Sequence, residues 1–150
     1  MENTLIESLK TLFNRDLKKL KKEIEAYQDE QHLWITEKNI SNCAGNLCLH
    51  LIGNLNAFIG AELGNSGYVR KRDLEFSQKR VSRLEMLLMI DDTKSVVEKS
   101  LNQLTAEDLL KDFPLQVFNE KVSTLHFLLH LSTHFNYHLG QINYHRRLLD

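Results

Sequence analysis

The chain has 150 residues, of which 42% are hydrophobic and 26% are charged, and its formal net charge is −1 with neutral histidines. This length predicts a single domain over residues 1–150, and the near-zero charge argues against nucleic acid or an anionic membrane as a partner. Because the start MENTLIESLK is too polar for a signal peptide, no run of about 18 apolar residues exists, and Cys43 and Cys48 make no disulfide framework, we predict a cytoplasmic protein.

Long amphipathic segments with few prolines indicate an all-α fold. The first predicted helix covers residues 4–29, where apolar residues recur at steps of three and four positions. A loop around Trp34 follows, and the second predicted helix begins at Ser41 or Asn42, both good N-cap residues, and continues to residue 63. The segment ELGNSGYVRKRDLEF is then predicted as a loop, because GNSG is rich in turn-forming residues.

The third predicted helix begins with a capping box, in which Ser82 caps the first turn and Glu85 hydrogen-bonds back to it. It continues to about residue 104, and a short helix in TAEDLLKD follows, capped by Thr105 and stopped before Pro114. The last predicted helix begins near Ser123 and continues almost to residue 150. Four long helices, with long connections before the third and the fourth, predict a four-helix bundle, whose core is a usual place for metal sites.

Five of the seven histidines fall in the last predicted helix, in the segment HFLLHLSTHFNYHLGQINYH. At about 100° per residue, they form a slowly drifting series on the helix surface rather than one straight row. Histidines four residues apart lie close enough for both imidazoles to bind one metal ion, but a third ligand must come from another helix. The five are His126, His130, His134, His138 and His145.

His50, on the second predicted helix, is the clear candidate for that third ligand. Asn46 and Asn54 lie one turn to either side of it, and a polar Asn–His–Asn ladder is costly to bury without partners. This face should therefore border a polar cavity, and a metal pocket is one such cavity. The alternative is that His50 is an ordinary hydrogen-bonded core histidine and that the histidines of the last helix lie at the surface.

Among the neighbouring pairs, His134 and His138 lie in the more polar middle of the last helix. Gly140, just beyond them, predicts close helix packing near the site, because a glycine inside a helix costs about 1 kcal/mol relative to alanine. The two earlier histidines are then expected in packing or at the wall of the pocket. His145 is expected near the solvent-exposed end of the helix.

The segment HFNYHLGQINYHRRLL resembles the C-terminal His-x-x-x-His-x-Gly-Gln-Ile segment of the DinB-like (DinB/YfiT) superfamily. Members of that superfamily are four-helix bundles and include bacillithiol S-transferases and mycothiol-dependent isomerases. The second-helix segment NLCLHLIGNL supports the resemblance and, with RKRDLEF, looks closest to an uncharacterised subgroup. The resemblance implies a metal site formed by His50, His134 and His138, a zinc or nickel ion, and a homodimer.

Three neutral imidazoles leave the full charge of a divalent ion at such a site, which acidifies a bound water or thiol. Resemblance to the transferase branches implies a metal-dependent enzyme that transfers a low-molecular-weight thiol, its cosubstrate, to a small-molecule electrophile. Hydrolysis by activated water stays open as a second reaction. A metal-binding bundle without turnover and a purely structural or dimeric interaction domain stay open as well.

Three polar side chains are candidates for orienting the metal ligands or contacting a substrate. Asn54 lies on the second predicted helix and Gln141 on the last, and for both the alternative is helix packing through a satisfied amide. Arg72, in the predicted loop, has the chemistry to meet a substrate carboxylate. Glu62 and Glu75 have the chemistry of acid–base groups, but nothing in the sequence ties either to the site, so no catalytic residue is predicted.

Overall fold

The computed structural model describes residues 4–150, and within them the chain consists of helices and loops without a β-strand. The predicted all-α fold is therefore confirmed. No helix in this range combines the length and the apolar character that crossing a bilayer requires. Residues 1–3, which belong to the polar start considered above, lie outside the described part of the chain.

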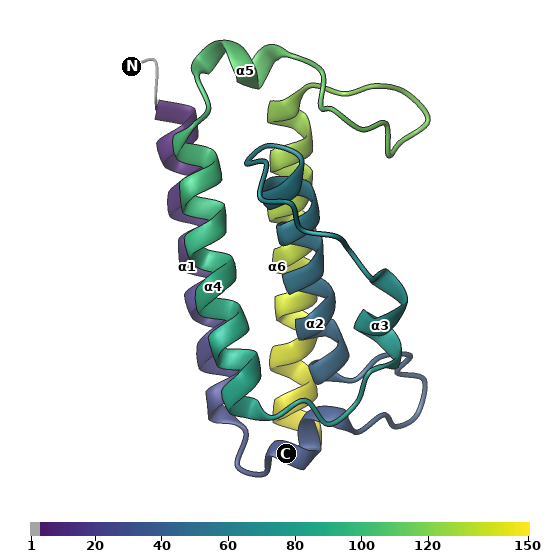
Figure 1. The fold of residues 1–150 in the computed structure, drawn as a ribbon. Helices are drawn as coiled ribbons and strands as arrows, with labels where there is room; N and C mark the ends of the chain where they lie inside the picture. Colours follow the sequence, from purple (N-terminus) through teal and green to yellow (C-terminus); the bar gives the residue numbers. More distant parts are fainter. Residues whose placement is uncertain (1–3) are drawn as a thin grey trace.

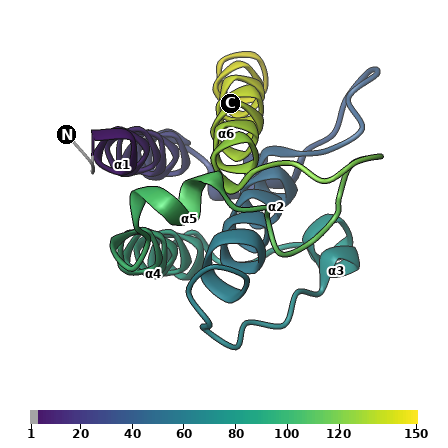
Figure 2. The ribbon, with the colours of Figure 1, turned by 90° about the horizontal axis from the view of Figure 1, so that it is seen from above.

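Within the described residues, four long helices run side by side along the length of the molecule (Figure 1), and their apolar faces meet in a common core. The four are α1 (Thr4–Ala26), α2 (Ala44–Leu55), α4 (Arg83–Asn102) and α6 (Thr124–Leu149), and two short helices are α3 (Arg72–Ser77) and α5 (Ala106–Leu110). In the view from above, α5 crosses one end of the long helices and α3 lies outside α2 (Figure 2). The chain rises in α2 and descends in α6, so these two neighbouring helices are antiparallel (Figure 1).

The end of the first helix differs from the prediction by one turn. α1 ends at Ala26 rather than at residue 29. Asp29 instead caps a 3-10 helix, η1 (Glu30–Trp34), because its side chain accepts a hydrogen bond from the backbone N–H of Gln31. An aspartate favours such a cap over a position inside a helix.

α2 begins after Cys43 rather than after Ser41 or Asn42, so the predicted N-cap is wrong. The Cys43 side chain makes no capping hydrogen bond, and a favourable cap therefore does not set this helix start. Tertiary packing sets it, because the Trp34 ring packs against the first turn of α2 and every residue of α2 is buried. A π-helical segment, η2 (Asn56–Ala61), continues α2 close to its predicted end.

The segment ELGNSGYVRKRDLEF, predicted as a loop, contains the helix α3. A helix of 6 residues is too short to show the apolar periodicity that identifies longer helices. Tertiary hydrogen bonds hold it, because the Asn46 amide donates to the carbonyl oxygens of Glu75 at 2.9 Å and Gln78 at 2.8 Å. This correction matters for function because it places Glu75 against α2.

The predicted starts of the later helices are confirmed. Ser82 caps α4 by accepting a hydrogen bond from the backbone N–H of Glu85 at 3.1 Å, but the Glu85 side chain makes no hydrogen bond back to Ser82, so only half of the predicted capping box is formed. Thr105 forms a complete capping box with Asp108 at the start of α5, and Ser123 caps α6. These side chains satisfy amide groups that have no partner within their own helix.

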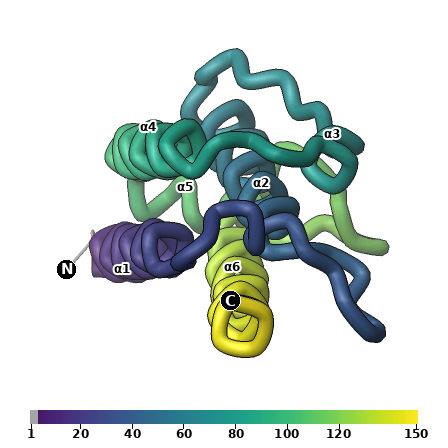
Figure 3. Tube along the Cα trace, turned by 90° about the horizontal axis from the view of Figure 1, so that it is seen from below, coloured from purple at the N-terminus to yellow at the C-terminus, as the bar shows by residue number. Residues whose placement is uncertain are grey.

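At the end of the molecule facing the viewer in Figure 3, the segment after α1 lies against the end of α6. The Tyr27 hydroxyl donates to Nδ1 of His145 at 2.6 Å, and Nε2–H of His145 donates to the Ile35 carbonyl at 2.8 Å. Asp150 accepts from two backbone N–H groups of the same segment. The prediction that His145 lies near a solvent-exposed end is wrong, because these partners replace water and leave it 4% exposed.

Candidate metal centre

The structure brings together His50, His134 and His138 from two antiparallel helices. His50 lies in the middle of α2, and the other two lie one turn apart on α6. Ring nitrogen atoms of the three residues all lie within 4.8 Å of one another, and Nε2 of His50 lies 3.2 Å from Nε2 of His134. Among residues 4–150, no other group of three His, Cys, Asp or Glu side chains has such a spacing.

The Asn–His–Asn ladder of α2 lies in the interior of the molecule, beside the other two histidines. Asn46, His50 and Asn54 are all buried. The Asn46 amide donates to the carbonyl oxygens of Glu75 and Gln78, and its Oδ1 accepts from Cys43 and Lys79. Oδ1 of Asn54, by contrast, has no hydrogen-bond partner in the protein. Because an unsatisfied buried acceptor costs free energy, this amide oxygen is available for a further donor.

Glu75 fixes the orientation of the His50 ring. Its Oε1 accepts a hydrogen bond from Nδ1–H of His50 at 3.0 Å, and Arg70 donates to its two oxygens at 2.8 and 2.9 Å. Burial alone would raise the pKa of Glu75, but the hydrogen bonds from His50 and Arg70 and the charge of Arg70 outweigh it, so this pKa lies below its ordinary value. The ionised carboxylate can only accept, so Nδ1 of His50 carries a proton and Nε2 is the nitrogen that can offer a lone pair to a metal ion.

Gln141 fixes His138 in a corresponding way. Its Oε1 lies 2.7 Å from Nδ1 of His138, so Nδ1–H donates and Nε2 again keeps the lone pair. Burial lowers the pKa of His138, and the smaller effect of the Gln141 hydrogen bond opposes it. A partner on the second ring nitrogen is typical of metal-binding histidines.

His134 is the most strongly perturbed of the three. Burial, followed by the neighbouring His138 and His50, lowers the pKa of His134 to about 4, so its ring is neutral near pH 7. Its Nδ1 is buried without a hydrogen-bond partner. The lowered pKa values of His134 and His138 favour their neutral imidazoles, which is the form that binds metal.

This donor set fits a divalent metal ion. In a tetrahedral site with metal–nitrogen distances of about 2.0–2.1 Å, two ligand nitrogens lie about 3.4 Å apart. The 3.2 Å between Nε2 of His50 and Nε2 of His134 is close to that value. Without a metal ion, the same distance suits a hydrogen bond between the two rings.

Arg72 lies near the site without touching the histidines. Its guanidinium lies 5.2 Å from the centre of the Phe76 ring, and the centre of that ring lies 4.9 Å from the centre of the His50 ring. Sequence reasoning missed the contacts of Arg70, Glu75 and Phe76 with His50. All three occur in RKRDLEF, the segment that supports the family resemblance. Because this segment was predicted as a loop, its position beside His50 was not recognised.

Two further histidines of α6 lie outside the cluster. His130 packs edge-on against Phe118, with ring centres 4.9 Å apart, and His126 is exposed. Gly140 is not at a close contact, since a Cβ atom there would find no atom within 4 Å. The predicted packing of Gly140 is therefore wrong, because this side of α6 is exposed.

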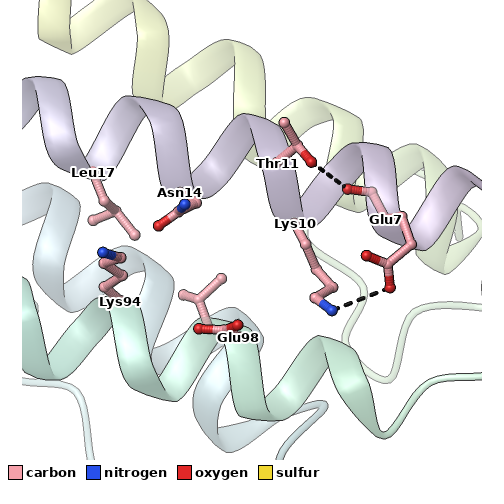
Figure 4. Close-up of a pocket in the computed structure, with 8 residues that line it drawn as sticks. Glu7, Lys10, Thr11, Asn14, Leu17, Lys94 and Glu98 are labelled. Carbon is pink, nitrogen blue, oxygen red and sulfur yellow. Dashed lines mark hydrogen bonds and ion pairs between the residues drawn. The ribbon is translucent and has the colours of Figure 1, made fainter.

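Two cavities differ in their relation to the histidines. A cavity of about 190 Å³ between α1 and α4 is lined mainly by charged and polar side chains and by none of the predicted site residues (Figure 4). There, Glu7 and Lys10 form an ion pair on α1, while Lys94 and Glu98 line the α4 side. A larger cleft, of about 510 Å³, follows α6 and includes His138 in its wall.

Comparison with known proteins identifies a matching family but does not indicate which reaction or ligand the chain has. A family model described as "Protein of unknown function (DUF1572)" matches residues 1–150. No curated protein matches the sequence. The description names no ligand, reaction or partner, so the chemistry has to be inferred from the side chains.

Proposed function

Because the chain belongs to the DUF1572 family of proteins of unknown function, we propose its function from the histidine site. The proposal is a divalent-metal-dependent enzyme that activates a thiol for transfer to a small-molecule electrophile. The observation that carries it is the convergence of three imidazoles from α2 and α6, two of which have an acceptor on the outer nitrogen. A divalent ion held there supplies positive charge that favours the deprotonated form of a bound thiol or water.

The resemblance of HFNYHLGQINYHRRLL to the DinB-like superfamily supports the same proposal. With it we propose a four-helix bundle of the DinB/YfiT type, zinc or nickel as the metal, and a homodimer. The four long helices and their order are compatible with that bundle. Sedimentation analysis at several protein concentrations tests the homodimer.

In this proposal the protein's own residues hold the three ligands in place. Glu75, itself clamped by Arg70, and Gln141 keep the Nε2 lone pairs of His50 and His138 available for the metal ion. Fixing the rings in advance reduces the entropy that metal binding would otherwise cost.

Asn54 is proposed as the corresponding partner of His134. Asn54 lies one turn beyond His50 on α2, and His134 lies one turn before His138 on the antiparallel α6, so both are displaced toward the same end of the molecule. Oδ1 of Asn54 is a buried acceptor without a donor, and Nδ1 of His134 is a buried nitrogen without a partner. Nδ1–H of His134 would satisfy Asn54 directly or through one water molecule.

Arg72 is proposed as a contact for a negatively charged group of the substrate, from the α3 side of the site. It is exposed, and its guanidinium lies over the Phe76 ring, which packs against His50. The same centre is suited to activating water, and a metal-binding protein without turnover has the same geometry. The experiment below distinguishes these three functions.

The first measurement is the metal content of purified protein by elemental analysis. We expect about one divalent ion per chain, its loss in His134→Ala, and its retention in His130→Ala, which removes a histidine one turn earlier on the same helix. Because the metal binds only the folded protein, a chelator should lower the melting temperature of the wild type and of His130→Ala but not of His134→Ala. Equal metal content in the two variants would contradict the metal centre.

The second measurement is consumption of a low-molecular-weight thiol in the presence of an electrophile such as an alkyl halide or epoxide. We expect turnover by the metal-loaded wild type and none above background by His134→Ala. Hydrolysis of an ester or amide without thiol consumption would assign the hydrolase function instead. Bound metal with no turnover in either assay would assign a metal-binding protein.

A further inference from the structure

The cleft of about 510 Å³ on α6 borders the metal centre at His138. His138 and Gln141, which are hydrogen-bonded to each other, both line it, so the edge of the centre is also part of the cleft wall. From there the cleft follows α6 to Leu148. Its volume lies within the range of about 300–1,000 Å³ that is typical of small-molecule sites.

One wall of the cleft is an apolar strip on α6. Tyr137, Tyr144 and Leu148 lie seven and four residues apart and share one face of the helix. They are 67%, 64% and 72% exposed, respectively, which is high for side chains of this size. Ile40, from the loop before α2, faces the same cleft. Such exposed tyrosine rings offer flat surfaces on which another ring can pack.

The wall that residues 4–150 form around the cleft contains no carboxylate, ammonium or guanidinium group. None of the described residues that line it is Asp, Glu, Lys or Arg, although 26% of the chain is charged. Its other polar groups include the neutral side chains of Asn39, Ser41 and Asn42. A charged ligand group would lose water there without gaining a counter-charge, whereas an apolar group with neutral hydrogen-bonding substituents would be matched.

We propose that this cleft binds an uncharged aromatic or alkyl group of the substrate beside the metal centre. The assignment to a substrate, rather than to some other small molecule, rests on the proposed function. The cleft is a specificity site distinct from the histidines, and it selects among substrates by the apolar group they carry. A second copy of the chain could cover the same strip, and the experiment separates that occupant from a small molecule.

Methyl NMR with two thiols tests the proposal on metal-free and zinc-loaded protein. Benzyl mercaptan carries the ring that the cleft should bind, and ethanethiol is the control without it. We expect benzyl mercaptan to shift the methyl signals of Ile40 and Leu148 in both forms of the protein. It should bind at least about tenfold more tightly than ethanethiol, because the ring is removed from water. The carboxylate analogue 4-(mercaptomethyl)benzoate should bind more weakly than benzyl mercaptan.

A matched pair of variants locates the effect. Leu148→Ser should abolish most of the preference for benzyl mercaptan, while Leu129→Ser, at an exposed position of the same helix outside the cleft, should retain it. Equal binding of the two thiols, or equal behaviour of the two variants, would overturn the proposal. So would Ile40 and Leu148 signals that respond to protein concentration rather than to the probe, because the occupant would then be a second copy. If zinc does not bind, the proposed function fails, but the preference for the ring in metal-free protein still decides this inference.

Discussion

At the scale of single residues, Glu75 orients one of the three histidines of the candidate centre. It is buried and accepts hydrogen bonds from His50 and Arg70, so its carboxylate holds the imidazole in one orientation and one tautomer. The contact joins residues 25 positions apart and depends on a helix too short to be predicted. His134 and His138 were predictable because they form an i, i+4 pair, and His50 was singled out by the asparagines one turn to either side of it; the resemblance to the DinB-like superfamily joined the three. The Glu75 contact leaves no such pattern in the sequence.

Glu75→Gln should therefore weaken metal binding about 10- to 100-fold, the usual effect of removing an outer partner of a ligating histidine. The amide removes the negative charge and leaves Arg70 without its ion-pair partner, so we also expect a lower melting temperature. Titration against a competing chelator measures the affinity. Glu62→Gln is the matched control, and an equal affinity of the two variants would count against a role for Glu75.

Asn54 allows a test in which affinity and stability move in different directions. Asn54→Leu removes an unsatisfied buried acceptor, so the metal-free protein should be as stable as the wild type or more stable. The same change should lower metal affinity about tenfold or more, because His134 loses its proposed partner. Asn54→Asp, which keeps an acceptor, should restore the affinity. If instead Asn54→Leu lowers stability and leaves affinity unchanged, its role is packing.

At the scale of helices, the order of the elements and most of their starts were predictable. Ser82, Thr105 and Ser123 act through local hydrogen bonds, which sequence patterns report directly. The start of α2 and the whole of α3 were not predictable, because packing against Trp34 and hydrogen bonds from Asn46 set them. Sequence patterns thus predict the start of a helix where a neighbouring side chain caps it. They fail where contacts with residues far away in the sequence set the start.

Gly53 on α2 and Gly140 on α6 should respond to substitution by alanine in opposite ways. Gly140→Ala should raise the free energy of unfolding by about 1 kcal/mol, because the position is inside a helix and has open space for a methyl group. Gly53→Ala should lower stability and metal affinity, because its Cβ would overlap the Glu75 carboxylate. Denaturant unfolding of the metal-free proteins measures both effects. A lower stability of Gly140→Ala would contradict this expectation and would indicate a close contact at Gly140.

At the scale of the whole molecule, two kinds of hydrogen bond join α6 to the segment after α1: one is between buried side chains, and the others are accepted by a carboxylate. Tyr27 and His145 form the buried contact, and Asp150 accepts from the N–H groups of Gln28 and Asp29. These contacts bridge at least 110 residues of sequence, which is why His145 was expected in solvent. An all-α molecule was predictable from periodicity, but the way in which its ends are joined was not.

Asp150 gives this contact a pH dependence. The N–H of Gln28 first, and then that of Asp29 and the His32 side chain, hold the pKa of Asp150 below its ordinary value, despite partial burial. The unfolded chain, with a pKa of about 3.9, then binds more protons than the folded protein as the pH falls. The stabilisation is therefore complete well above pH 4 and is lost as pH falls through the lower, folded-state pKa.

Asp150→Asn should consequently be less stable than the wild type at pH 7, and the difference should shrink in acid. Urea unfolding at a series of pH values between about 7 and 3 measures it. A difference that stays constant over this range would show that the charge of Asp150 does not contribute.

The division of the three histidines between α2 and α6 also has a consequence for synthesis of the protein on the ribosome. When α2 has emerged from the ribosome, the chain presents His50 without the other two histidines, which emerge later with α6. If the proposed centre binds a metal ion, binding would therefore follow translation of α6. Premature termination before Ser123 yields a chain that lacks the predicted centre and one of the four long helices.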